Sequence, residues 1–339
     1  MKLKIKDIAK LANVSIASVS LALNNKPGIS FETREKILKI AQQQGYTNKP
    51  SIPAKNKVVR FVACTSPGIV IKQYETLPFF TELIKYIGEY LSLKGYSLMI
   101  STINSENLEN EINQLTEDNA CNGILLLGTD LTKKQITFIA EHQPNVVVLD
   151  TCFETLNIDF VNMNSTLGAY QAGTHLIDLG HRRIGYVQSN VRIRNFDLRK
   201  EGFLMALKEY NLSISEKDYF SVVPTTLSSQ EQLKQNILKR GGDLPTALFC
   251  ESDYIAISLV KSLTEIGIKV PDDISVIGFD DIPECNVMNP ELTTIHVQKR
   301  KMASLAVDRI IELMEISPHE KIKFVVDTEL ISRNSCVKK

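Results

Sequence analysis

Short apolar segments alternate with amphipathic ones from residue 58 to residue 279, and this alternation restricts the fold more than any other feature. Val58–Cys64 is the first apolar run, and Pro78–Lys94 is the first amphipathic run, which ends at Gly95. Strands that alternate with helices predict parallel sheets covered by helices on both faces. Because about ten such units exceed one ordinary sheet, we expect two doubly wound lobes. Further strands are expected at 97–101, 123–127, 145–150, 183–188, 247–250 and 275–279.

A different pattern precedes the lobes. Residues 5–24 predict two short helices around a turn at 12–14. Ser15 can cap the second helix, because its hydroxyl oxygen can accept a hydrogen bond from a backbone N–H that has no partner within the helix. Such a pair of helices is a helix-turn-helix, whose second helix enters the DNA major groove. The side chains expected to face inward are Ile8, Leu11, Ala12, Val19, Ala22 and Leu23, and those expected to face outward are Ile16, Ala17, Ser20 and Leu21.

A third helix completes an all-α head, residues 1–46. Ser30 can cap this helix, and Gly45 is a natural end for it. Its expected buried stripe consists of Ile37, Leu38, Ile40 and Ala41. Residues 47–57, which are polar and basic and hold two prolines, are expected to form a linker.

Charge separates the head from the body. The whole chain has 39 basic and 39 acidic residues, but residues 1–60 hold twelve Lys or Arg against three acids, a formal charge of +9. A basic head suits the neutralisation of DNA phosphates. The alternative, a solvated basic tail, does not account for the helical periodicity and the caps.

Several classes of protein and site are disfavoured. No apolar run approaches the roughly 20 residues that span a bilayer, and no signal core follows the N-terminus, so we expect a cytoplasmic, nucleoid-associated protein. The six cysteines lack Cys-x-x-Cys spacing, which favours reduced thiols over a disulfide or metal site. Residues Thr65–Gly68 lack the glycine pattern that binds a dinucleotide phosphate, so no cofactor is expected. No serine nucleophile has a matched base, so the chain is not expected to be an enzyme.

The chain resembles the lactose/galactose repressor family along nearly its whole length. The matching motifs are Asp7-Ile-Ala, Ala12-Asn-Val-Ser, Val19-Ser, Leu23-Asn, Thr33-Arg-Glu-Lys-Ile, Gly45-Tyr, Gly180-His-Arg-Arg-Ile, Arg199-x-x-Gly-Phe, Pro245-Thr-Ala, Asp272–Asp281, Pro290-x-Leu-Thr-Thr and Glu329-Leu-Ile-x-Arg. The resemblance implies a bacterial transcription regulator with a two-lobed body similar to periplasmic sugar-binding proteins. Such regulators bind a palindromic operator as dimers, and a small molecule between the lobes changes their DNA affinity.

The resemblance also implies DNA contacts. Ile16, Ala17 and Leu21 fall on base-reading positions, where apolar side chains leave thymine methyl contacts and shape readout. A core role for Leu21 is the alternative. Phosphate contacts are implied for Ser15, Ser20, Asn24 and Thr33, with helix capping as a second role for Ser15. In the linker, Pro53 opposes the family's hinge helix, and Ile52 is the candidate minor-groove wedge.

Effector residues are implied around the junction of the lobes. Arg199 matches a ligand-binding arginine of the family, and its planar fork suits a vicinal diol, carboxylate or phosphate, with a surface ion pair as the alternative. The other candidates are Phe79, Phe80, Asp150, Asn195, Ser252, Asp253 and Asp280. A core role for one phenylalanine and helix capping for the acidic residues remain open. Val297 stands where some sugar-binding members have glutamine.

The sequence therefore predicts a repressor that responds to a sugar or sugar phosphate, with lobe 1 at 58–162 plus 296–318 and lobe 2 at 163–295 plus 319–339. The chain ends six residues after Arg333 without a leucine heptad, so a homodimer is expected. A non-sugar effector or a protein corepressor is the alternative. A solute-binding protein and an α/β enzyme are disfavoured.

Overall fold

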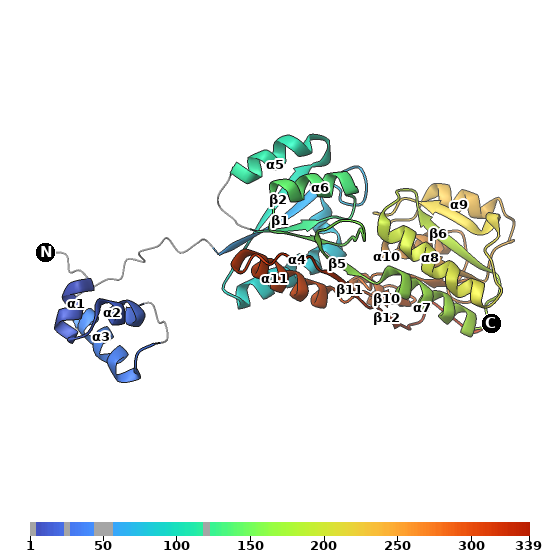
Figure 1. Cartoon of the computed structure of the whole chain (residues 1–339). Helices are drawn as coiled ribbons and strands as arrows, with labels where there is room; N and C mark the ends of the chain where they lie inside the picture. The colour runs from blue at the N-terminus through green and yellow to red at the C-terminus, as the bar shows by residue number, and fades with distance from the viewer. Residues whose placement is uncertain (1–4, 24–27, 44–56, 118–122) are drawn as a thin grey trace. The chain divides into compact units, whose positions relative to one another are not determined.

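The computed structural model describes residues 5–23, 28–43, 57–117 and 123–339, which fall into two units divided after residue 56. In the first unit, the described residues form α1 (Ile5–Ala12), α2 (Ile16–Leu23) and α3 (Phe31–Gln43) (Figure 1). The expected end of the head at residue 46 and the linker up to residue 56 lie outside the described residues.

The head packs around one apolar cluster. Its buried members are Ile8, Ala9, Ala12, Val19, Ala22, Ile37 and Ala41. The tight turn between α1 and α2 depends on Asn13, whose φ of 56° lies in the left-handed region that asparagine tolerates. Two inward predictions are wrong: Leu11 is 54% exposed, and Leu38 is 39% exposed. In α1, Ala9 is buried beside the predicted Ile8 and Ala12, and in α3 the predicted Ile37 and Ala41 are buried.

The first lobe of the second unit contains a six-stranded parallel sheet in the order β11-β5-β4-β3-β1-β2. The strands are β1 (Val58–Thr65), β2 (Ser97–Asn104), β3 (Ile124–Leu127), β4 (Val146–Leu149), β5 (Asp159–Met163) and β11 (Lys323–Val326). One face is covered by α4 (Pro78–Leu93) and α11 (Lys299–Glu315), and the other by α5 (Leu108–Glu117) and α6 (Lys133–His142) (Figure 1).

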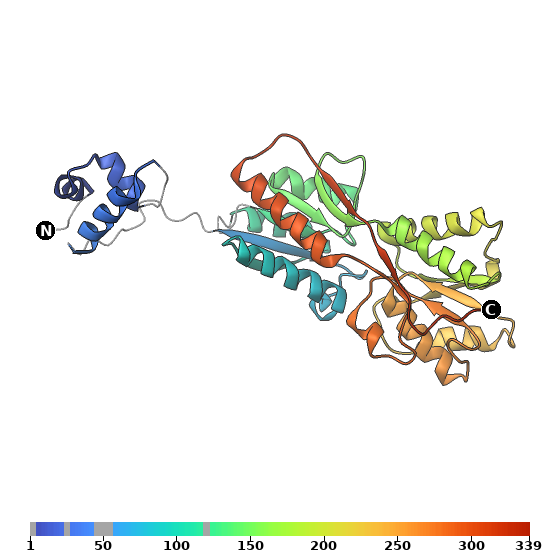
Figure 2. The ribbon, with the colours of Figure 1, turned by 90° about the horizontal axis from the view of Figure 1, so that it is seen from below.

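The second lobe contains a four-stranded parallel sheet in the order β7-β6-β8-β9. Its strands are β6 (Ile184–Ser189), β7 (Tyr219–Val222), β8 (Ala247–Cys250) and β9 (Ser275–Ile277). The helices α7 (Ser165–Asp178) and α8 (Arg194–Glu209) lie on one side of this sheet, and α9 (Glu231–Leu238) and α10 (Asp253–Glu265) lie on the other (Figure 2). The two doubly wound lobes confirm the predicted fold class.

The chain passes between the lobes again near its C-terminus (Figure 2). An antiparallel pair, β10 (Thr294–His296) and β12 (Glu329–Ile331), lies beside these crossings. The expected assignment of all of 319–339 to lobe 2 is wrong, because β11 pairs in parallel with β5 in the sheet of lobe 1. The four-residue run Lys-Phe-Val-Val of β11 is too short to reveal its partner.

Four of the cysteines that the structure describes, Cys64, Cys152, Cys250 and Cys285, are buried free thiols, and Cys336 is a half-buried one. Burial raises the pKa of the Cys64 thiol to about 12, which makes it a poor nucleophile. Cys121 lies outside the described residues. Among the helices in the described ranges, none is both long and apolar enough to cross a membrane.

Candidate functional site

A cavity that opens to solvent lies between the two lobes of the second unit. Its walls come from the loops after β1, β3, β4, β7 and β9 and from the first turns of α4, α8 and α10. The lining residues are Ile69, Leu77, Phe79, Phe80, Thr129, Asp150, Ile193, Asn195, Phe196, Arg199, Pro224, Thr225, Ser252, Tyr254 and Asp280. Ligands of α/β folds sit at such carboxyl ends of strands.

Seven of the eight predicted effector residues line this cavity, and Asp253 does not. Asp253 is fully buried, and its carboxylate accepts hydrogen bonds from Thr294 Oγ1 at 2.6 Å and from the Ile282 backbone N–H at 3.1 Å. The carboxylate therefore joins the start of α10 to the loop after β9 and to β10. We correct the prediction for Asp253: it is a structural residue behind the site.

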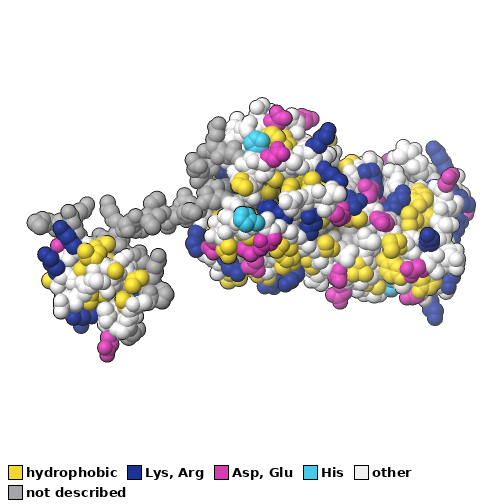
Figure 3. Space-filling model, in the orientation of Figure 1, with side chains coloured by type: hydrophobic (Ala, Val, Ile, Leu, Met, Phe, Trp, Pro, Cys, Tyr) yellow, Lys and Arg dark blue, Asp and Glu magenta, His cyan; other side chains and the backbone are white. Residues whose placement is uncertain are grey.

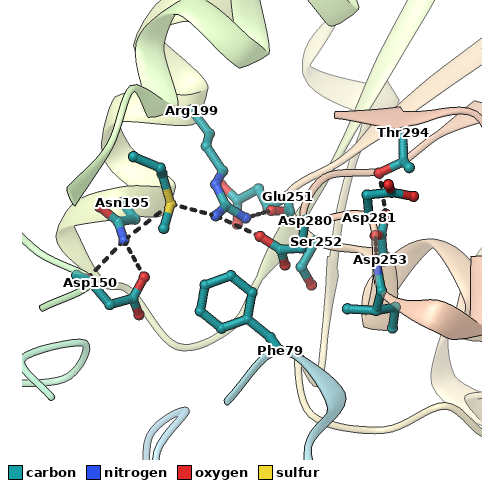
Figure 4. Close-up of polar contacts among 12 residues, drawn as sticks. Phe79, Asp150, Asn195, Arg199, Glu251, Ser252, Asp253, Asp280, Asp281 and Thr294 are labelled. Carbon is teal, nitrogen blue, oxygen red and sulfur yellow. Dashed lines mark hydrogen bonds and ion pairs between the residues drawn. The ribbon is translucent and has the colours of Figure 1, made fainter. Parts of the chain in front are cut away.

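Arg199, which is 3% exposed, occupies the centre of the site (Figure 4). Its Nη1 donates to the Glu251 carbonyl at 2.5 Å, and its Nη2 donates to Asp280 Oδ1 at 2.9 Å. The guanidinium carbon lies 3.7 Å from the centre of the Phe279 ring. This stacking and pairing hold the guanidinium plane in one orientation, so the alternative of a surface ion pair is wrong.

Asp150 forms a second polar group on the opposite wall. Thr129 Oγ1 donates to its Oδ2 at 2.5 Å. Asn195 Nδ2 donates to its Oδ1 at 3.2 Å (Figure 4). Burial raises the pKa of Asp150 to about 7, although the Thr129 hydrogen bond opposes this rise. Near neutral pH this carboxyl group can therefore either accept or donate a hydrogen bond to a ligand hydroxyl.

The backbone is strained where the two acidic groups stand. The φ angles of Asp150 and Asp280 are 61° and 118°, in the region that disfavours side chains other than glycine. Lys299 Nζ donates to the carbonyls of Asp280 at 2.9 Å and Asp281 at 3.1 Å, which holds the second strained segment in place. Burial raises the pKa of Asp280 to about 6, against the opposing charge of Arg199. Backbone strain at two residues that line one cavity is typical of a preorganised ligand site.

Aromatic rings supply the apolar walls. Phe79 and Phe80 come from the start of α4, with their ring centres 5.4 Å apart in an edge-to-face arrangement. Across the cleft, the Phe79 backbone N–H donates to the Tyr254 hydroxyl at 3.0 Å, a second link between the lobes beside the bonds from Asn195 to Asp150. Sequence reasoning missed Tyr254, Thr129 and Phe196. Only Phe196 had a local signal, because it stands three residues before Arg199 on the same helix.

The head presents the second candidate site. Ser15 caps α2, since its Oγ accepts the Ser18 N–H at 3.0 Å. Ile16 is 57% exposed and Ala17 is exposed, whereas Ser20 and Leu21 are half-buried. Thr33 is half-buried at the start of α3, where its Oγ1 and the Ser30 hydroxyl are 2.8 Å apart. The candidates Asn24 and Ile52 lie outside the described residues.

Comparisons with known proteins match both units. Residues 4–49 match the family of bacterial regulatory proteins, lacI family, and residues 174–336 match a periplasmic binding protein-like domain. The ribose operon repressor of Haemophilus influenzae is 31% identical over 327 residues, which cover 95% of this chain and 94% of that protein. The HTH-type transcriptional repressor PurR of Aliivibrio salmonicida is 30% identical, with 98% of each chain covered. The solved structure of the lac repressor dimer bound to operator and the anti-inducer ONPF has a TM-score of 0.73 at 22% identity and covers 99% of this chain and 100% of that one.

Proposed function

Because the chain belongs to the lacI family of bacterial regulatory proteins, whose members similar to it are transcriptional repressors, we propose that it represses transcription as a homodimer on a palindromic operator and responds to an uncharged sugar. It is a DNA-binding regulator with a ligand-binding body and not an enzyme. The choice of effector rests on one observation: the polar side chains of Asp150, Arg199 and Asp280 and several aromatic rings line the same cavity.

The polar groups suit a ligand with several hydroxyls. A carboxylate accepts from a hydroxyl, a guanidinium donates to one, and the apolar face of a sugar ring packs on aromatic rings such as Phe79 and Phe80. One of the two relatives compared above is a repressor named for a ribose operon.

Charge argues against a sugar phosphate. The cavity lining has two carboxyl groups, Asp150 and Asp280, and one guanidinium, that of Arg199. The charge of Arg199 is already paired with Asp280, whose Oδ1 lies 2.9 Å from Nη2. A phosphate would therefore lose its hydration opposite carboxyl groups without an available counter-charge.

The homodimer is proposed from a likeness in fold: the similar lac repressor structure is that of a dimer bound to operator. A dimer places two heads on two half-sites about one helical turn of DNA apart. The helices α4 and α5 of the first lobe are our candidates for the interface.

Thermal unfolding of the full chain in the presence of single sugars tests the effector. We expect at least one uncharged monosaccharide to raise the Tm, because a ligand that binds only the folded state stabilises it. Asp280→Asn should abolish this shift, and Asp197→Asn, whose side chain is 57% exposed, should preserve it. A shift with sugar phosphates alone, or with no sugar of the panel, contradicts this assignment.

A further inference from the structure

The outward face of α2 is uncharged although it belongs to a DNA-binding head. Helix α2 has the sequence Ile-Ala-Ser-Val-Ser-Leu-Ala-Leu and carries no charged side chain. Val19 and Ala22 are buried in the head, whereas Ile16 in the first turn leaves 57% of its surface in water. Figure 3 shows apolar side chains on the visible face of the head and Lys and Arg side chains towards its edge. The formal charge of +9 on residues 1–60 complements the phosphates of DNA. The second helix of a helix-turn-helix enters the major groove, so we take the major groove as the partner of this face of α2.

The three apolar side chains at base-reading positions are not equivalent. A Cβ atom added at Gly28 would lie 3.3 Å from Leu21 Cδ1, so the half-buried Leu21 side chain already lies close to Gly28. The Leu21 carbonyl also accepts a hydrogen bond from Arg34 Nη1 at 3.3 Å, which ties this end of α2 to α3. Leu21 is therefore held by the head, and Ile16 with Ala17 remains to meet the base edges.

Base chemistry limits what Ile16 can read. Guanine, adenine and cytosine are distinguished in the major groove by hydrogen bonds that need Arg, Lys, Asn, Gln, Glu or Asp, whereas thymine presents an apolar 5-methyl group. An isoleucine over a guanine or cytosine edge would remove water from polar atoms without replacing their hydrogen bonds. Over a thymine methyl, the same side chain removes only apolar surface from water.

We propose that Ile16 selects thymine by contact with its 5-methyl group at one position of each operator half-site, with Ala17 leaving room for that contact. This inference rests on the proposed function, since it requires a sequence-specific operator. It assigns the specificity at that position to burial of a methyl group, and it assigns Leu21 to support of the head.

The test uses the full chain and an operator selected with it from random DNA. Each thymine of the selected half-site is replaced in turn by deoxyuridine, which removes the methyl group and keeps the pairing. One position should lower the affinity about fourfold per half-site, because burying one methyl is worth about 0.8 kcal/mol. In Ile16→Ala this penalty should disappear, and in the control Leu11→Ala, an equally exposed change on α1, it should persist.

The outcomes separate the two proposals. Selection that yields no preferred sequence overturns the proposed function. A preferred operator whose affinity is unchanged by every deoxyuridine replacement overturns the role of Ile16 alone, as does a deoxyuridine penalty that persists in Ile16→Ala. Loss of the penalty in Leu21→Ala with its retention in Ile16→Ala would assign the reading to Leu21 instead.

Discussion

Replacing Asp150 by asparagine should make the stability of the protein less dependent on pH. The pKa of this carboxyl group rises from its ordinary 3.8 to about 7 on folding, because burial disfavours the charged form. Between these two values the folded state keeps a proton that the unfolded state has lost. The free energy of unfolding of the natural protein therefore falls as the pH rises through this interval, and it levels off above the folded pKa.

The magnitude follows from the two pKa values. Between pH 5 and pH 8 the Asp150 contribution should decrease by about 3 kcal/mol, since each unit of pKa difference corresponds to about 1.4 kcal/mol. Asparagine does not titrate, so the stability of Asp150→Asn relative to the natural protein should rise by that amount over the interval. The Thr129 hydroxyl can reverse its hydrogen bond to suit the amide.

Urea unfolding of the full chain at several pH values, followed by far-ultraviolet circular dichroism, measures this difference. Thr129→Val should move the pH step upward, because the hydrogen bond that it removes lowers the pKa of Asp150. Asp308→Asn, an exposed change on α11, is the control for the substitution itself. A difference between Asp150→Asn and the natural protein that stays flat from pH 5 to pH 8 would refute the assignment.

Three further predictions concern the lobe junction, the site arginine and the head. Tyr254→Phe removes the acceptor of the Phe79 N–H, which should lower the free energy of unfolding by about 1–3 kcal/mol. Loss of this link between the lobes should also increase the radius of gyration in X-ray scattering. The control Tyr210→Phe, at an exposed position, should change neither quantity. Arg199→Ala should lower the free energy of unfolding by about 3–5 kcal/mol, because it leaves Asp280 buried without its partner. In urea unfolding, the double variant Arg199→Ala with Asp280→Asn should recover part of this loss. Equal stabilities of the single and double variants would contradict the ion pair. Gly28→Ala should weaken operator binding in titrations and leave the affinity for the effector unchanged. The φ angle of Gly28 is +118°, and the new Cβ would press on Leu21 of α2. An unchanged operator affinity would show that Gly28 does not influence the position of α2.

Local patterns in the sequence predicted the parts of the structure that local chemistry determines. The alternation of strands and helices gave the doubly wound lobes, and Ser15 gave the cap of α2. Long-range pairing was beyond such patterns. The short strand β11 joins β5 only because the chain crosses back to the first lobe, which no local periodicity encodes.

The site shows the same division. Ser252 and Asp253 are neighbours with similar local signals, yet Ser252 lines the cavity and Asp253 does not. What separates them is Thr294, forty-one residues away, whose hydroxyl binds the Asp253 carboxylate. Similarly, Leu11 and Ala9 differ in burial because the packing of three helices decides which face of α1 turns inward, and the spacing of apolar residues along one helix does not encode that packing.

The central claim is that an uncharged sugar bound between the lobes changes the affinity of the chain for a specific operator. Equilibrium titration of labelled operator with the full chain, with and without the sugar that raises the Tm, tests it most directly. The account predicts salt-sensitive, sequence-specific binding whose Kd changes at least tenfold with the sugar in the natural protein, and a Kd that the sugar leaves unchanged in Asp280→Asn. An operator Kd that the bound sugar leaves unchanged in the natural protein would contradict it.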